Sequence, residues 1–130
     1  MQKELIEKNP ILKLTLDFSL MVMDYCEKLE ETKKFVIARQ LLKSGTSIGA
    51  NSIEAQNAES KADFIHKIKI ASKEADETQY WLTLCGYAPN HPDCLLLSEQ
   101  LEEIQKVLNK ILSTAKRKTP ISFLFSYFIF

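Results

Sequence analysis

The residues with the clearest catalytic or metal-binding chemistry in this 130-residue chain are two histidines and three cysteines. Asp63 and His66 form a carboxylate-x-x-His unit, and di-iron helical bundles use such units in pairs, with further carboxylates from two other helices. The second histidine, His91, lies in a loop between two prolines and forms no such unit. The sequence therefore predicts no di-metal centre.

Cys85, His91 and Cys94 are zinc-type ligands, but they lack a paired C-x-x-C spacing and an obvious fourth ligand. A Cys85–His91 pair would allow an activated thiol, although a reduced cysteine half-buried at a helix end is the interpretation that we prefer. The sequence has no glycine-rich phosphate loop after a strand and no nucleophile elbow. We therefore expect a protein that is not an enzyme and that binds no metal or other cofactor.

Basic residues are concentrated between positions 61 and 73, where four lysines and one aspartate give a local net charge of +3. Two more basic residues, four apart in the preceding segment, can extend this patch. Such a patch would attract phosphate, and the alternative is a solvated lysine face. The candidate nucleic-acid-binding residues are Arg39, Lys43, Lys61, Lys67, Lys69 and Lys73.

Composition limits the protein to one domain and one core. The chain is 45% hydrophobic, and its 17 basic and 17 acidic residues cancel, which disfavours a strongly basic nucleic-acid binder. Its three glycines and four prolines fall mostly between long periodic segments, which indicates an all-α fold. An odd number of cysteines at unrelated spacings, with no signal peptide before them, favours the cytoplasm.

The first two predicted helices follow clear signals. Asn9 can cap a first helix of about twenty residues with Pro10 at its first position. Its apolar stripe is Leu14, Phe18, Met21, Tyr25 and Leu29. Thr32 can cap the second helix, which continues past Gly45 and Gly49, where another backbone can approach closely. Its apolar positions are Phe35, Val36, Leu41, Leu42, Ile48 and Ile53.

Two more helices complete the pattern. Ser60 can cap the third helix, with Asp63 in a role like that of the capping-box acid. Its inward stripe is Phe64, Ile68, Ala71, Ala75, Thr78 and Leu82, and it ends near Cys85 or Gly86. The fourth helix begins near Pro92, and its apolar positions are Leu97, Leu101, Ile104, Leu108, Ile111 and Leu112. Together they predict an antiparallel up-down-up-down four-helix bundle over residues 1–119.

An apolar tail, residues 120–130, follows the predicted bundle. After Pro120 it reads ISFLFSYFIF, ten residues without charge, which are too few to span a bilayer as a helix. We expect no membrane association and favour a tail that packs on its own bundle or on a neighbouring copy. A membrane-surface anchor and a disordered end are the alternatives.

Small and polar residues replace leucine on one face of the second predicted helix. Ser44, Ser47, Asn51 and Glu54 recur every three or four residues, so they share that face. We expect Asn51 to be buried and Glu54 to make an interhelical or intersubunit hydrogen bond, with Lys67 or the hydroxyls of Ser47 and Thr78 as partners. Trp81, in the third helix, is expected in the core or in a subunit interface, with base stacking as the alternative.

These residues also carry a family resemblance. The pattern reads LLKSGTSIGAN, then EA, then SKADFIHKIKIASKEADETQYWLTL. It resembles the four-helix-bundle family of proteins encoded in intervening sequences of bacterial 23S ribosomal RNA genes, often called S23 ribosomal proteins, to which accessory proteins of diversity-generating retroelements are similar. The likeness covers residues 14–112 and is strongest over residues 41–84.

The resemblance implies a function as well as a fold. Members resemble one another in forming barrel-like homopentamers, which implies roles in bundle or subunit packing for Ser47, Asn51, Glu54, Lys67, Glu74 and Trp81. The retroelement relatives imply nucleic-acid binding through a basic surface. We therefore expect an oligomeric scaffold that binds RNA or DNA. The alternative is a protein-interaction module that recruits another protein.

Overall fold

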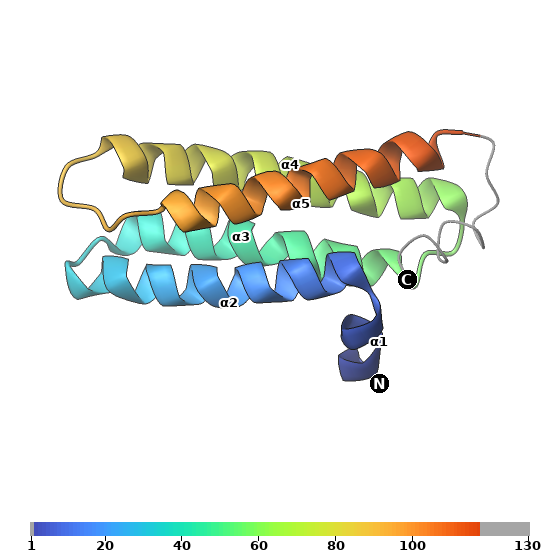
Figure 1. Ribbon diagram of the computed structural model, residues 1–130, viewed down its shortest axis with the longest axis horizontal. Helices are drawn as coiled ribbons and strands as arrows, with labels where there is room; N and C mark the ends of the chain where they lie inside the picture. Colours follow the sequence, from blue (N-terminus) through green and yellow to red (C-terminus); the bar gives the residue numbers. More distant parts are fainter. Residues whose placement is uncertain (1, 118–130) are drawn as a thin grey trace.

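Four long helices run antiparallel to one another and are joined at alternating ends (Figure 1). The computed structural model describes residues 2–117, and this part of the chain contains five helices. They are α1 (Gln2–Lys8), α2 (Pro10–Glu31), α3 (Phe35–Ala55), α4 (Lys61–Tyr87) and α5 (Leu95–Ala115). Helices α2 to α5 form the up-down-up-down bundle that the sequence predicts. Each packs against two neighbours, so α2 lies diagonally across the bundle from α4.

The short helix α1 is not among the helices that the sequence predicts. It projects from the bundle at the start of α2 (Figure 1), and Leu5 and Ile6 pack partly against the core. Seven residues with so few apolar positions give no recognisable period. Asn9 separates α1 from α2 and caps α2 as predicted, because the Leu12 N–H donates a hydrogen bond to Asn9 Oδ1 (3.4 Å).

The prediction that Thr32 caps the helix starting at Phe35 is wrong. Thr32 instead ends α2, and its hydroxyl donates a hydrogen bond to the Leu29 carbonyl (3.3 Å). Lys33 has a left-handed φ of 64°, and the Lys34 N–H donates to the same Leu29 carbonyl (2.9 Å). These hydrogen bonds form a Schellman motif, in which Thr32 is the C-cap residue of α2. The first residue of α3 therefore follows Lys34, whose side chain makes no capping hydrogen bond.

Helix α4 begins and ends close to the predicted positions. The Asp63 N–H donates to Ser60 Oγ (3.1 Å), which confirms Ser60 as the cap. Asp63 Oδ2 accepts from the Glu59 N–H (3.2 Å), one residue before the cap, so the reciprocal half of the capping box is displaced. The helix ends at Tyr87, just beyond the predicted Gly86.

The predicted core is correct for α4 and α5 and only partly correct for α3. All the predicted inward residues of α4 are buried, as are those of α5 from Leu97 to Ile111. In α3, Leu41 and Ile48 are buried, but Phe35, Val36 and Leu42 are exposed. Phe35 and Val36 occupy the first turn, at the end of the bundle, and Leu42 lies about 100° around the helix from Leu41. The apolar residue type alone does not show whether a position lies at the end of the bundle or on the outer side of the helix.

Close packing of α2 on α3 depends on the two glycines of α3. A Cβ atom added at Gly45 would lie 3.0 Å from Val22 Cγ1, and one at Gly49 would lie 3.2 Å from Thr15 Oγ1. The Thr15 hydroxyl donates to the Ile11 carbonyl of its own helix (2.8 Å), so it needs no partner on α3. The two backbones approach where side chains are absent, as the sequence predicts.

Two further observations concern membranes and the C-terminal tail. Among residues 2–117, no helix is both long and apolar enough to cross a bilayer. The predicted packing of residues 120–130 lies outside the residues that the structure describes.

We expect Gly45→Leu to lower the free energy of unfolding by about 1–3 kcal/mol, because the larger side chain would collide with Val22. Gly86→Ala is the matched control. A Cβ atom there would meet only Cys94 Sγ, at 3.9 Å, so alanine should raise stability by up to about 1 kcal/mol through helix propensity. Urea unfolding followed by circular dichroism measures both changes. A Gly45→Leu protein as stable as the wild type would contradict the close α2–α3 packing.

Candidate association surface on α3 and α4

The α3–α4 seam contains a buried hydroxyl pair. Ser44 and Thr78 are fully buried, their oxygens share a hydrogen bond (2.9 Å), and Thr78 Oγ1 also lies 2.7 Å from the Glu74 carbonyl. Hydroxyls that are satisfied in this way fit where leucine side chains would force the helices apart, and they favour one register of α3 against α4.

The polar residues predicted to direct packing follow the outer edge of this seam. Ser47 Oγ donates to the Lys43 carbonyl (2.6 Å), and Asn51 Nδ2 donates to the Ser47 carbonyl (2.9 Å). Asn51 is half-buried instead of buried, and its bond stays within its own helix. Glu54 makes the interhelical contact, because Lys67 Nζ lies 3.3 Å from Glu54 Oε1. This edge is therefore polar but already hydrogen-bonded within one chain.

Glu74 and Trp81 continue the seam on α4. Partial burial raises the pKa of the Glu74 carboxyl, nearby Glu77 raises it further, and Lys43 and Lys73 act in the opposite direction. Trp81 Nε1 donates to Glu77 Oε2 (3.1 Å), and the ring is only half-buried. Trp81 therefore belongs to a partly exposed surface instead of the core. Its indole packs against the edge of the core with its own polar group satisfied.

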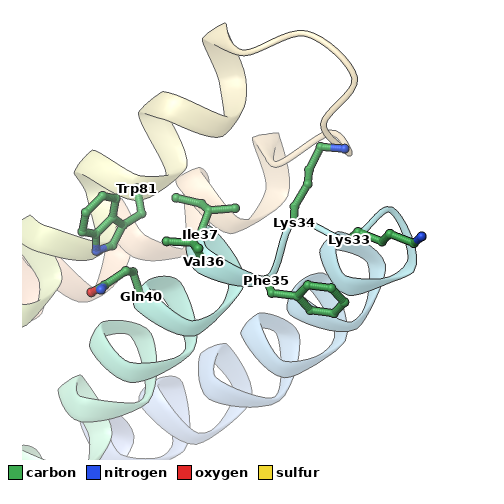
Figure 2. A pocket seen from close by; sticks show the side chains of 7 residues that line it. All are labelled: Lys33, Lys34, Phe35, Val36, Ile37, Gln40 and Trp81. Carbon is green, nitrogen blue, oxygen red and sulfur yellow. The ribbon is translucent and has the colours of Figure 1, made fainter.

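A shallow hollow of about 550 Å³ lies where α3 begins, and Trp81 of α4 lines one end of it (Figure 2). Figure 2 shows Trp81 of α4 next to Gln40 of α3, with Val36 and Ile37 beside them and the lysines of the α2–α3 turn at the far end. Ile37 also lines a second hollow together with Leu84 and Tyr87. Because Ile37 lines both, the two hollows adjoin each other at this end of the bundle.

The basic candidates do not share one face. Lys61 Nζ donates to the Arg117 carbonyl after α5, and Lys67 is paired with Glu54. Lys69 and Lys73 are exposed on the outer side of α4 and make no ion pair within residues 2–117. The remaining two, Arg39 and Lys43, are exposed on α3. The run of lysines in the sequence is therefore divided among three sides of α4.

Cysteines gather near the α4–α5 connection. Cys26, Cys85 and Cys94 are all buried and unpaired. The Tyr25 hydroxyl donates to the Pro92 carbonyl (2.7 Å) beside the thiols of Cys85 and Cys94, and burial raises its pKa. Burial also raises the pKa of the Cys85 thiol, although a hydrogen bond from Tyr25 works against this effect. A raised pKa disfavours the thiolate, so Cys85 is a poor nucleophile.

The residues with metal-binding chemistry do not complete a metal site in the part of the chain that the structure describes. Within residues 2–117, no three side chains among His, Cys, Asp and Glu are grouped so that they could hold an ion. His66 is exposed on α4, and His91 Nδ1 lies 2.9 Å from the Pro89 carbonyl in its own loop.

Sequence reasoning missed several exposed apolar residues on α2 and α4. Tyr80, Leu84 and Tyr87 lie on the outer side of α4, and Leu16, Leu20 and Met23 on the outer side of α2. In each helix these residues are spaced by three and four, a pattern that is also typical of a core stripe. The signal that could have found them is a second stripe on a helix whose core stripe is already complete.

Comparisons with known proteins agree with the fold. No curated protein matches the chain. A crystal structure of a protein of unknown function from the S23 ribosomal protein family of Bacteroides thetaiotaomicron is similar over 78% of this chain and 97% of its own, with 40% sequence identity and a TM-score of 0.76. The model of the 23S rRNA-intervening sequence protein family matches residues 7–110. The chain therefore belongs to the 23S rRNA-intervening sequence protein family.

Proposed function

We propose that this protein is a non-enzymatic scaffold of the cytoplasm that associates with copies of itself. The contact is made by the exposed surface at the start of α3 and the end of α4, the α3–α4 face. The observation that carries this proposal is the pair of adjoining hollows whose apolar lining includes Val36, Ile37, Trp81, Leu84 and Tyr87. Val36 is 70% exposed and Tyr87 is 88% exposed. Such a cluster beside a polar edge is typical of a protein interface.

The polar edge supports the same assignment. Ser47, Asn51, Glu54 and Glu74 lie farther along the α3–α4 seam, and the contacts of the first three are made within the chain. They can therefore enter a contact without leaving a buried group unsatisfied. The family resemblance favours a closed ring of five copies. The three unpaired cysteines among the described residues accord with a reducing compartment.

A second candidate function is binding of RNA or DNA by the outer side of this face. Lys43 and Lys73 both act on the Glu74 carboxyl, and Lys69 lies about one turn from Lys73. A ring would repeat these three exposed lysines in every copy, and repeated weak phosphate contacts add to one another. Recruitment of another protein by the same apolar surface is the alternative.

Light scattering coupled to size exclusion should give a mass that is several times the 14.9 kDa of one chain. Val36→Asp should weaken association by at least about tenfold, because a buried polar group left unsatisfied costs about 1–3 kcal/mol and a charged group costs more. Leu95→Asp is the matched control, since Leu95 is also exposed and also lies in the first turn of a helix. A wild-type mass of one chain, or equal effects of the two variants, would contradict self-association through this face.

If nucleic acid is bound, reversing Lys43, Lys69 and Lys73 to glutamate should abolish binding at low salt. The wild type should lose affinity steeply as salt rises, with a log-log slope of about 1 per lysine contact. Lys13, Lys28 and Lys106 are the control set, because reversing them changes the net charge equally on other surfaces. Fluorescence anisotropy with labelled structured RNA and duplex DNA measures the affinities. Absence of binding by the wild type at low salt would reject this candidate in favour of a protein partner.

A further inference from the structure

The end of the bundle where α4 connects to α5 contains two buried thiols that the proposed function does not use (Figure 1). Cys85 lies in the last turn of α4, and Cys94 directly precedes α5. Cys94 Sγ donates a hydrogen bond to the Leu82 carbonyl (3.3 Å), and a Cβ atom added at Gly86 would lie 3.9 Å from the same sulfur. The Cys94 sulfur is therefore packed against the turn of α4 that contains Cys85.

Tyr25 of α2 adjoins both thiols. Burial raises the pKa of the Tyr25 hydroxyl, and interactions with Cys85 and with Cys94, hydrogen bonding included, raise it further. One hydroxyl group can interact with two sulfurs in this way only when both lie near it. The sulfurs of Cys85 and Cys94 are therefore neighbours around the same tyrosine oxygen.

The third cysteine, Cys26, is hydrogen-bonded to a different helix. Its sulfur donates to the Ala38 carbonyl of α3 (3.3 Å), and burial raises its pKa to about 11. Cys94 Sγ instead bonds to α4, the helix that carries Cys85. The hydrogen bonds of the three thiols thus favour a pairing of Cys85 with Cys94.

The two neighbouring thiols line different hollows of the surface. Cys85 lines the hollow that it shares with Ile37, and Cys94 lines a hollow of about 350 Å³ together with Thr83 of α4 and Ser98 of α5. Cys94 is 8% exposed, whereas Cys85 is 3% exposed. A small oxidant therefore reaches Cys94 more readily than Cys85, and it does so from the α4–α5 side.

We propose that Cys85 and Cys94 form a reversible disulfide when the protein meets hydrogen peroxide. The Cys94 sulfur, having lost its proton, attacks one peroxide oxygen and the O–O bond breaks, which leaves a sulfenic acid on Cys94 and releases one water. The Cys85 sulfur then attacks the Cys94 sulfur, the S–O bond breaks, and the leaving hydroxide takes the Cys85 proton as a second water. Two thiols are oxidised to one disulfide while one peroxide is reduced.

The surroundings of the two thiols assign them to different steps. Burial raises the pKa of the Cys85 thiol, and its hydrogen bond with Tyr25 acts in the opposite direction. Cys85 is therefore poorly suited to meet dilute peroxide as a thiolate, but a neighbouring sulfenic acid is present at high effective concentration. Cys94, which is the more exposed thiol, suits the first step.

The disulfide joins the last turn of α4 to the residue that precedes α5, and it closes the connection formed by residues 86–93. Cys94 Sγ then no longer donates to the Leu82 carbonyl. Disulfides in reducing compartments are usually transient and redox-sensing, which agrees with a bond that peroxide forms and other thiols reverse.

Oxidation of the folded full chain with hydrogen peroxide tests this pairing. The wild type should lose two of its three free thiols, and dithiothreitol should restore them. Chymotrypsin cuts after Tyr87, between the two cysteines, so mass spectrometry should find two peptides joined through Cys85 and Cys94. Cys26→Ser is the matched control and should form the same linkage at a similar rate.

Cys85→Ser and Cys94→Ser should each slow disulfide formation by on the order of tenfold or more, because the neighbouring sulfur is gone. Circular dichroism shows whether these variants are folded, and the peptide map of the wild type and of Cys26→Ser decides the pairing if they are not. The wild-type chain oxidised in urea should give several pairings, since only the folded chain holds Cys85 beside Cys94.

Three outcomes would overturn the inference. The first is a main linkage that includes Cys26, and the second is a covalent dimer on a non-reducing gel in place of a bond within one chain. The third is a folded protein that keeps all three thiols while the same peroxide oxidises the urea-unfolded chain.

Discussion

Helix α3 can occupy its place only because its two packed sides are made of small residues. Toward α2, Gly45 and Gly49 offer no side chain where Val22 and Thr15 press against the backbone. Toward α4, Ser44 offers a hydroxyl that Thr78 satisfies. Larger residues on either side would separate the layers and reopen the core that the aliphatic stripes of α4 and α5 fill. The spacing and the register of the helices therefore depend on the absence of large side chains from these two sides of α3.

This constraint also explains why the polar signature of α3 is a poor guide to function. Residues that look available in the sequence, such as Ser47, Asn51 and Glu54, have partners within the chain. The surface that remains unpartnered is apolar and lies at one end of the α3–α4 face and along α2. A distinctive motif can thus identify a family by its packing while the interaction surface lies on residues of ordinary type.

Much of the fold was accessible from the sequence, because long periodic segments and strong caps determine it locally. Asn9 and Ser60 were identifiable as caps, and the inward stripe of α4 was correct throughout. Thr32 was assigned to the wrong helix because a left-handed turn at Lys33 depends on φ, which no residue type there announces. The distribution of the lysines around α4 was harder still to predict. Neighbours in sequence on a helix diverge by about 100° per residue, so a local charge count does not define a surface.

The hydrogen bond from Tyr25 to the Pro92 carbonyl joins residues 67 positions apart. The contacts of α2 with α3, and of α3 with α4, link consecutive helices. The Tyr25–Pro92 bond instead requires the α4–α5 connection to pack against α2. The entropy of closing so long a loop must be overcome before the bond can form, so neighbouring helix pairs have the kinetic advantage. The Tyr25 hydroxyl thereby ties the α4–α5 connection to α2, and the buried thiols of Cys85 and Cys94 lie beside this bond.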